Sequence, residues 1–595
     1  MSLSPRSTLL AAPIALAALS ITVPLACSSE RPGFQSTEVP PFPEAGDVEP
    51  DACAGLRCSR DLKKVLDGCT DEVVEECGPD QGCGDGRCMD ACTSAILSKG
   101  SSGCSFWTLP PTDKPEHSRG SCFAAMIANT WDRPVAIAAE LGAEPLDVSR
   151  SVYIARKNGI DTTYERLAGP LPPGEVGIVF LAQTPLPPET QYFVPCPTGV
   201  EPALRGDPIE HGTARTRAFR LTTDAPVTAY SIFPYGGASS FLPTATLLLP
   251  VSSWSTNYLA ISTAHADPKA PRLLQIVADE DSTDVWIDPR ADIADGIDLP
   301  GTARGVPQRW TLARGDVLQF AQHGDLAGSP IESSKPVGVF GGAGCAFLPA
   351  SFGACDITQQ QIPPLQQWGH EYVLAPYQPR KGDPAAGARE RVPYSLVGAV
   401  GGTTLTWDPA RPQGAPEALE AGQVATFMTE DLVVVKSQDA AHPFHAAVYM
   451  TGSTFVSGPL GTMGDPDFVN LVATAQYLDR YVFFTDYTYP ETTLTFVRRR
   501  TASGFHDVEL ACAGNITGFI PVGTAGEYEL AWVQTTKEWR PTRFGDGECG
   551  YGRNEARSDG PFSVTVWGMG HTASYGYAGG MGSRPVNGVK VPVVR

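Results

Sequence analysis

One pattern of landmarks recurs along the chain at domain-sized intervals, and it limits the fold more than any other feature. Three copies open with an aromatic residue and a tyrosine four positions later: Trp254 and Tyr258, Trp368 and Tyr372, Tyr477 and Tyr481. The copies start 114 and 109 residues apart. This period is too long for a short-repeat solenoid, and it indicates units of domain size.

Two further motifs follow inside the copies. The pattern Leu-x2-Gly-x-Val-x2-Phe occurs at residues 312–320 and 419–427. Alternation of apolar residues with a period of two predicts a strand with one buried face. Four prolines directly precede such alternating segments: Pro226, Pro336, Pro443 and Pro561. Because proline at the first residue of a strand removes no ladder hydrogen bond, we expect each of them to begin the last strand of its copy.

Composition favours an all-β fold. The 595 residues include 61 Gly and 54 Pro, while 18% are charged and 9% are aromatic, which is typical of a turn-rich β protein with a packed core. About six to eight strands in a copy of about 110 residues fit one β-sandwich-like unit. A β-propeller is the alternative, if each copy divides into two four-stranded blades. The predicted β units are residues 94–250, 251–367, 368–476 and 477–595.

Residues 51–93 carry seven of the fifteen cysteines. Zinc sites favour Cys-x2-Cys pairs, whereas the gaps here are four, ten, seven, five, four and three residues. We therefore predict a small disulfide-stapled module without metal, in which the odd cysteine pairs outside, nearest to Cys104. Local pairs are expected for Cys345 with Cys355 and for Cys512 with Cys549, and the other connectivity is open. The cysteines predicted to form disulfides are Cys53, Cys58, Cys69, Cys77, Cys83, Cys88, Cys92, Cys104, Cys122, Cys196, Cys345, Cys355, Cys512 and Cys549.

An apolar run over residues 9–26 ends directly at Cys27. We interpret residues 1–26 as a lipoprotein signal peptide and Cys27 as the acylated first residue, although Pro24 stands where the bacterial lipobox has leucine. The alternative is an ordinary secretory signal, with Cys27 as a thiol. Both interpretations export the protein. The first predicts attachment to the bacterial cell envelope, at the outer membrane, with the Pro-, Ser- and Glu-rich residues 27–50 as a linker.

The net charge of −21 argues against a nucleic-acid partner, because phosphate recognition needs clustered Lys and Arg. The longest basic run, Arg498–Arg500, is interpreted as a solvated strand end.

Sequence motifs for acyl transfer, nucleotide binding and dinucleotide binding are absent. His442 and His445 lie three residues apart in a predicted strand, so their side chains point to opposite faces and cannot share a metal. We therefore expect no enzymatic activity, no metal and no cofactor.

Two local patterns suggest other interpretations. An acidic stretch offers the oxygen ligands that calcium prefers, but it matches no EF-hand loop and is also typical of loops in an acidic exported protein. Two Arg-Gly-Asp triplets, Arg205–Asp207 and Arg314–Asp316, suggest adhesion, although the second coincides with the glycine turn of the repeat. The carboxylates of the acidic stretch belong to Asp279, Glu280, Asp281, Asp284, Asp288, Asp292, Asp295 and Asp298.

Several strand and turn segments resemble the IgGFc-binding protein N-terminal domain as it occurs in surface lipoproteins of myxobacteria. The cysteine block before them resembles the modules found beside that domain. The resemblance implies an all-β surface protein, and it carries no binding residue over to this chain. The segments are Gly103–Trp107, Ala225–Tyr235, Leu247–Pro250, Gly398–Val400 and Met450–Ser453.

Together these features predict a non-enzymatic, lipid-anchored cell-surface protein that binds or adheres to an extracellular protein or glycan through loops of its β units. Tyr575 and Tyr577, near a glycine-rich segment, are candidate contacts. The alternatives are a secreted hydrolase with an unrecognised carboxylate site and a purely structural envelope component. A buried carboxylate pair in one cleft would favour the hydrolase.

Overall fold

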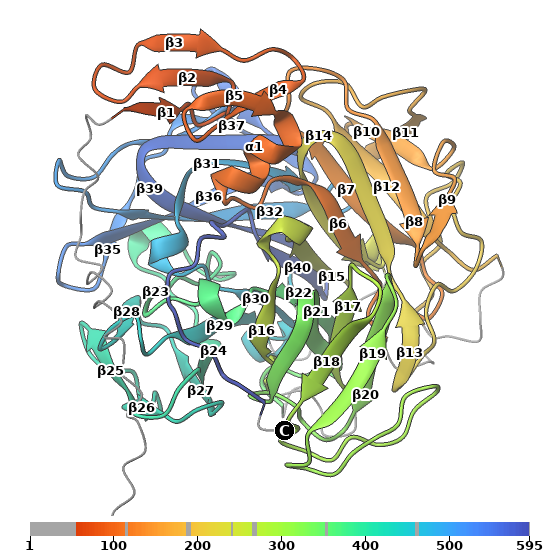
Figure 1. Cartoon of the computed structure of the whole chain (residues 1–595). Helices are drawn as coiled ribbons and strands as arrows, with labels where there is room; N and C mark the ends of the chain where they lie inside the picture. Colours follow the sequence, from red (N-terminus) through yellow and green to blue (C-terminus); the bar gives the residue numbers. More distant parts are fainter. Residues whose placement is uncertain are drawn as a thin grey trace, which may run out of the picture. The chain divides into compact units, whose positions relative to one another are not determined.

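Antiparallel sheets make up most of the regular structure (Figure 1). The computed structural model describes residues 55–593 except 113–116, 186–191, 240–241, 265–270, 351–354 and 458–462, and all of them belong to one unit, Cys53–Arg595. The prediction of an all-β fold with a disulfide-rich region before it is confirmed, and the propeller alternative is not needed. None of the helices in the described ranges is long and apolar enough to cross a membrane.

The cysteine-rich module comes first. Strands β1 (Leu56–Cys58), β2 (Lys64–Asp67) and β3 (Val73–Glu76) form a small sheet, and β4 (Gln81–Gly84) pairs with β5 (Arg87–Asp90). Helix α1 (Ala91–Ser98) follows, and the Asp90 side chain caps it by accepting a hydrogen bond from the Thr93 N–H at 2.9 Å. Disulfides supply stability where so small a module has little core to bury.

The first β unit contains one sheet of nine strands. They are β6 (Gly103–Thr108), β7 (Phe123–Asn129), β8 (Ile137–Leu141), β9 (Glu144–Leu146), β10 (Val152–Asn158), β11 (Asp161–Arg166), β12 (Val176–Ala182), β14 (Phe219–Phe233) and β15 (Thr244–Leu248). The order is β11-β10-β12-β7-β14-β8-β9, and β6 and β15 also pair with β14. The 15-residue strand β14 therefore organises this unit.

The second β unit contains one sheet of eight strands. They are β13 (Ala214–Arg217), β16 (Ser255–Leu259), β17 (Arg272–Ala278), β18 (Thr283–Ile287), β19 (Gln308–Leu312), β20 (Asp316–Gln322), β21 (Pro330–Ala346) and β22 (Asp356–Ile362). The order is β13-β20-β17-β21-β18-β19, and β16 and β22 also pair with β21. Strand β13 precedes the predicted unit 251–367, so this sheet recruits a strand from the region assigned to the unit before it.

The third β unit is a sandwich of two four-stranded sheets. One holds β23 (Glu371–Leu374), β25 (Thr403–Asp408), β26 (Ala418–Leu419) and β28 (Val433–Ser437). The other holds β24 (Val392–Gly398), β27 (Val424–Thr429), β29 (Phe444–Met450) and β30 (Asp467–Asn470). Aromatic rings meet between the sheets, Tyr372 with Phe444 at 4.9 Å and Trp407 with Phe427 at 5.5 Å.

The fourth β unit contains one sheet of ten strands. They are β31 (Leu478–Thr485), β32 (Glu491–Arg499), β33 (Val508–Leu510), β34 (Gly514–Asn515), β35 (Ile520–Val522), β36 (Tyr528–Lys537), β37 (Arg540–Phe544), β38 (Gly547–Cys549), β39 (Gly552–Gly570) and β40 (Ala573–Ala578). Short helical turns between the strands include η1 (Gly237–Ser239), η2 (Val251–Ser253), η3 (Leu365–Gln367), η4 (Pro384–Ala386), α2 (Ser453–Ser457) and η6 (Thr474–Gln476).

The repeated prolines mostly lie inside long strands, where the strand changes partners. Residues 331–333 of β21 pair with β18, whereas residues 337–343, after Pro336, pair with β17. Pro226 and Pro561 lie at register shifts in β14 and β39. The expectation that a proline begins the last strand is therefore wrong for three copies, and only Pro443 directly precedes its strand, β29. A residue without an N–H is tolerated where the ladder is already interrupted.

The repeated tyrosine makes the same local hydrogen bond in all three copies, and in two of them it also holds the bend of the long strand. Its hydroxyl accepts a hydrogen bond from the backbone N–H three residues upstream, at 3.2, 3.1 and 2.8 Å for Tyr258, Tyr372 and Tyr481. The hydroxyls of Tyr258 and Tyr481 also donate to the carbonyl groups of Val337 and Phe562, at 2.7 and 2.6 Å. These two residues directly follow the repeated prolines. In these two copies, the aromatic motif thus fastens the first strand to the long strand.

The four β units share their interior. Strands β15, β22, β30 and β40 contact one another in a closed order, because β15 and β30 each contact both β22 and β40. One buried apolar cluster draws residues from the first, third and fourth units, including Tyr230, Phe444 and Val566. A second cluster joins the first unit to Val277 and Phe340 of the second. The units are therefore packed together and do not have four separate cores.

Candidate ligand-binding cleft

A cleft of about 640 Å³ lies between the cysteine-rich module, the first β unit and the fourth β unit. The module contributes the turn after β1 and the segment after α1. The first unit contributes Trp131 and the bend of β14, and the fourth contributes the start of β31, the bend of β39 and the glycine-rich segment after β40. Ligand sites are commonly clefts of about 300–1,000 Å³.

Hydrogen bonds join the wall formed by the segment after α1 to the wall formed by the segment after β40. The Ser583 N–H donates to the Lys99 carbonyl group at 2.6 Å, and the Met581 N–H donates to the Ser101 hydroxyl at 3.2 Å. A Cβ atom at Gly580 would lie 3.0 Å from the Ser101 Oγ, so the absence of a side chain permits this approach. The segment after α1 and the segment after β40 consequently lie side by side.

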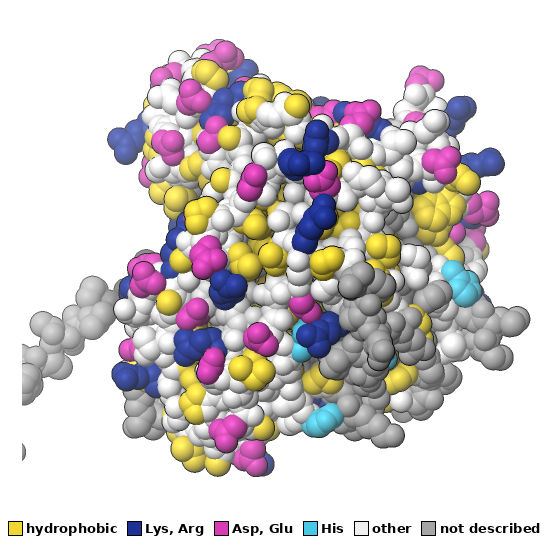
Figure 2. Space-filling model, turned by 90° about the vertical axis from the view of Figure 1, so that its right-hand side faces the viewer, with side chains coloured by type: hydrophobic (Ala, Val, Ile, Leu, Met, Phe, Trp, Pro, Cys, Tyr) yellow, Lys and Arg dark blue, Asp and Glu magenta, His cyan; other side chains and the backbone are white. Residues whose placement is uncertain are grey.

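Basic side chains outnumber acidic ones in the cleft, although the whole chain has a net charge of −21. On the face shown in Figure 2, by contrast, Lys and Arg side chains are interspersed with Asp and Glu. The cleft is lined by the basic residues Arg57, Arg60, Lys99, Arg480 and Arg584 and by the acidic residues Asp61, Asp479 and Asp559.

Three of the five cations are already neutralised. Arg60 forms ion pairs with Asp479 at 2.9 Å and with Asp559 at 2.8 Å. Arg480 pairs with Glu555 at 2.8 Å, and Arg57 pairs with Asp71. Within the described part of the chain, Lys99 and Arg584 form no ion pair.

The carboxylates of the cleft do not have the arrangement of an acid–base pair. Asp479 and Asp559 both bind Arg60, and their side chains are 47% and 81% exposed. The hydrogen bond from Arg60 lowers the pKa of Asp559, whereas a general acid needs a raised pKa. Asp61 accepts hydrogen bonds from the Ser59 hydroxyl and the Lys63 N–H. The cleft therefore fits binding better than hydrolysis.

Comparison with known proteins identifies the family. A family model described as IgGFc binding protein matches residues 244–568, which is more than half of the chain. The chain belongs to the IgGFc-binding protein family. A human protein named IgGFc-binding protein is 26% identical over 183 residues, which are 31% of this chain. The match spans only 3% of that human protein.

The region that matches the IgGFc-binding family builds only one wall of the cleft. The residues of β31 and the β39 bend lie inside residues 244–568. The module, the residues of the first unit and the segment after β40 lie outside that match. The cleft therefore combines part of the sheet that contains β31 and β39, which the family model matches, with segments outside the match.

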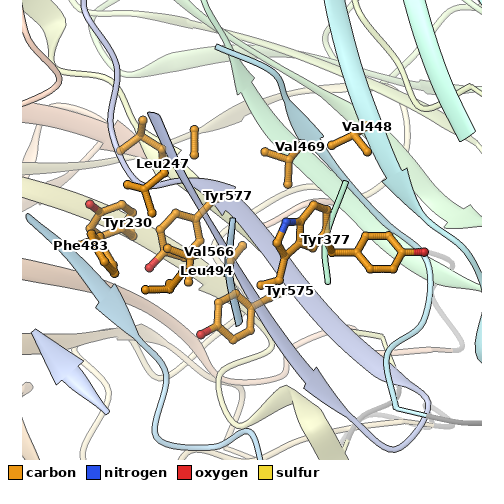
Figure 3. Close-up of a cluster of buried hydrophobic side chains, with 14 of the residues drawn as sticks. Tyr230, Leu247, Tyr377, Val448, Val469, Phe483, Leu494, Val566, Tyr575 and Tyr577 are labelled. Atoms are coloured by element: carbon orange, nitrogen blue, oxygen red, sulfur yellow. The ribbon is translucent and has the colours of Figure 1, made fainter. Parts of the chain in front are cut away.

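Tyr575 and Tyr577 are buried in β40, so their prediction as ligand contacts is wrong (Figure 3). Their exposed fractions are 1% and 0%. The Tyr577 ring packs on Tyr230 at 4.6 Å, and the Tyr575 hydroxyl accepts a hydrogen bond from the Asp486 N–H at 2.9 Å. A Cβ atom at Gly568 would lie 1.9 Å from the Tyr575 ring. The nearby glycine therefore makes room for a buried ring and does not mark a solvent-exposed loop.

Six disulfides pair twelve of the predicted cysteines. Both local pairs are present, and the module is joined to β6 through Cys104. Cys69 lies on an exposed turn, and Cys27 and Cys53 lie outside the described residues. The pairs are Cys58–Cys83, Cys77–Cys88, Cys92–Cys104, Cys122–Cys196, Cys345–Cys355 and Cys512–Cys549.

Three carboxylates of the acidic stretch bond three different groups. Asp279 accepts a hydrogen bond from the Trp107 indole at 2.6 Å, and Asp292 and Asp295 accept from the backbone N–H groups of Arg304 and Gly301. Over the ranges that the structure describes, no three His, Cys, Asp or Glu side chains gather as metal ligands. The calcium interpretation therefore has no geometric support at this stretch.

The two Arg-Gly-Asp triplets are held by internal contacts. Asp207 pairs with His211 at 2.8 Å and with Arg119 at 3.2 Å. In the second triplet, Gly315 has a φ of +80° and Asp316 pairs with Arg215 at 3.0 Å. Turn geometry accounts for this second triplet, as the repeat suggested.

The two histidines do not approach a common ligand position. His442 bonds Asp439 at 2.7 Å, whereas His445 is buried and its Nε2 lies 3.0 Å from the Asn470 Oδ1. Burial lowers the pKa of His445 to about 4, so this side chain is neutral at physiological pH.

Sequence reasoning missed the cleft because its walls come from segments almost 500 residues apart. Lys99 follows a short helix and Arg584 follows the last strand, and neither belongs to a motif. The useful signal is the glycine-rich run 576–582, which indicates close backbone packing.

Proposed function

We propose that this protein is an exported, lipid-anchored surface protein of the bacterial outer membrane that binds an extracellular protein or glycan in the cleft. Membership of the IgGFc-binding family supports a binding role that is not enzymatic. The six disulfides are typical of an oxidising compartment outside the cytosol. The observation that carries the proposal is the cleft itself, a concave site with two cations that no described carboxylate neutralises.

The anchor is tested by mass spectrometry of the native protein from membrane fractions, without reduction. We expect an amino-terminal Cys27 that carries acyl chains, and fourteen oxidised cysteines. A Cys27→Ala variant should lose membrane attachment while its disulfides still form. An unmodified Cys27 in a freely secreted product would contradict the anchor and leave the binding role to be tested separately.

The binding role is tested with the full mature chain on panels of extracellular proteins and glycans. The panel includes IgG Fc, because the human relative is named for binding it. Ala475 is exposed and lines the cleft, so Ala475→Trp should block a ligand without disturbing the core. Ala303→Trp, at an exposed loop of the second unit, is the matched control. The cleft is not the binding site if both variants bind like the wild type.

A further inference from the structure

We propose that the cleft binds an acidic polysaccharide and holds a carboxylate or sulfate group of that glycan between Lys99 and Arg584. This inference rests on the proposed binding function and names the chemical class of its ligand. Both cations line the cleft, and neither forms an ion pair with another residue in the described ranges. An oxyanion is the chemical partner that such a pair lacks.

Hydrogen bonds of the main chain hold the backbone at Lys99 and at Arg584 in place. Lys99 is the C-cap residue of α1, in the left-handed conformation with a φ of 55°. Its carbonyl group accepts the hydrogen bond from the Ser583 N–H, immediately before Arg584. The Arg584 carbonyl group accepts a hydrogen bond of 2.6 Å from the Gln476 side chain. The backbone under both cations is therefore ordered before a ligand binds, which reduces the entropic cost of binding.

The other charges of the cleft shape it and do not compete for the ligand. Arg60 bridges Asp479 and Asp559, which joins the module to both sides of the β31–β39 pair. Because these carboxylates are already paired, they oppose a bound anion less than free carboxylates would. Lys99 and Arg584, which form no ion pair with a described residue, give the cleft a local excess of positive charge.

The lining favours a glycan over a protein segment. Protein interfaces are anchored by aromatic and apolar side chains in a desolvated centre. Three aromatic residues line the cleft: Trp131 and Tyr481 are only 4% and 2% exposed, and Tyr477 is partly buried against an apolar cluster. The large apolar side chains that stand exposed in the described ranges, such as Leu56 and Val74, do not line it. A polar, charged ligand fits these walls better than an apolar peptide does.

The net negative charge of the chain should confine the binding of an acidic glycan to the cleft. A chain with a net charge of −21 repels polyanions over most of its surface, so an acidic glycan is held only where cations prevail. Partly exposed cations are screened by salt, and binding should weaken as the concentration of NaCl rises.

The test measures affinities of the full mature chain by calorimetry at low and at physiological salt. The probes are a sulfated heparin hexasaccharide, hexagalacturonate, neutral maltohexaose and hexaglutamate. The variants are Lys99→Gln and Arg584→Gln, with Arg166→Gln, an exposed cation on β11, as the matched control.

We expect a sulfated or a carboxylated glycan to bind, maltohexaose not to bind, and each cleft variant to weaken the affinity about tenfold. Arg166→Gln should bind like the wild type. Tighter binding of hexaglutamate than of either acidic glycan would overturn the glycan assignment in favour of an acidic protein segment. Binding of any ligand that Ala475→Trp blocks but Lys99→Gln and Arg584→Gln leave unchanged would overturn this inference and retain the proposed function. If neither the panel nor these probes contain a ligand that Ala475→Trp blocks, the proposed function itself fails.

Discussion

At the scale of single residues, the hydroxyls of Tyr258 and Tyr481 make the same two backbone hydrogen bonds. Tyr481 is 2% exposed, accepts from the Leu478 N–H and donates to the Phe562 carbonyl group. The hydroxyl of Tyr489 is also buried, but it has no hydrogen-bond partner among the described residues. These two side chains therefore allow a matched comparison.

Tyr481→Phe should lower the free energy of unfolding by about 1–3 kcal/mol, because it removes the hydroxyl that bonds the Leu478 N–H and the buried Phe562 carbonyl group. Tyr489→Phe removes a hydroxyl that is buried without a partner, so it should be neutral or stabilising. Chemical denaturation of both variants measures the difference. Equal destabilisation by the two variants would contradict the role assigned to the Tyr481 hydroxyl.

The buried carboxyl group of Asp486 makes the stability of the protein depend on pH. It is 1% exposed, and burial raises its pKa from 3.8 to about 6. In the unfolded chain the carboxyl group loses its proton near pH 3.8, while the folded protein retains the proton up to about pH 6. This group therefore contributes most stability at low pH, and the contribution falls as pH rises from about 4 to about 6.

Asp486→Asn removes this titration. Between pH 3 and pH 7, the stability of the variant relative to the wild type should improve by about 3 kcal/mol, since one pKa unit corresponds to about 1.4 kcal/mol. Asp161→Asn, at the exposed start of β11, is the matched control for the loss of a carboxylate. Urea titrations across this range provide the measurement, and parallel curves for Asp486→Asn and wild type would refute the shift.

At the scale of elements, the long strands depend on glycine where neighbouring backbones meet. Gly341 and Gly342 lie in β21, next to the loop after β16 and next to β22. A Cβ atom at Gly342 would lie 1.8 Å from the Thr358 carbonyl oxygen, and one at Gly341 would lie 1.9 Å from that of Ile261. These glycines are needed for close packing, because no side chain fits against two backbones.

Gly342→Ala should therefore lower the free energy of unfolding by about 3 kcal/mol or more, since the backbone must shift to admit the methyl group. Gly588→Ala is the control, because no atom lies within 4 Å of a Cβ atom at that position. The control should stay within about 0.5 kcal/mol of the wild type. Thermal melting of the two variants distinguishes packing from a general effect of replacing glycine.

At the scale of the whole molecule, shared cores replace the independent domains that a tandem repeat suggests. The cluster that contains Tyr230 and Val566 joins three units, and another joins Val397 of the third unit to the core of the second. The segment after β40 adds further links, because Asn587 donates to the carbonyl groups of Leu365 and Trp368. The boundaries at residues 250, 367 and 476 remain predictions. They separate elements that pack together in shared clusters.

We expect the β region to unfold in one cooperative transition. Calorimetry of the mature chain should show one main peak with equal calorimetric and van't Hoff enthalpies. Val566→Ala, in the fourth unit, should shift that whole peak to lower temperature, because its cavity affects a core that three units share. Four resolved transitions, with only one of them shifted by the variant, would show that the units unfold independently.

The sequence by itself determined the all-β class and the disulfide-rich module, because these follow from local patterns of apolar residues, turns and cysteines. Only the tertiary structure decided where the prolines bend the strands, since a strand that changes partners has the same local alternation as one that begins. It also decided that Tyr575 and Tyr577 are buried, because glycines beside aromatic residues occur both in loops and in crowded cores. The cleft depends entirely on the tertiary fold, as Lys99 and Arg584 become neighbours only when the segment after β40 returns to the module.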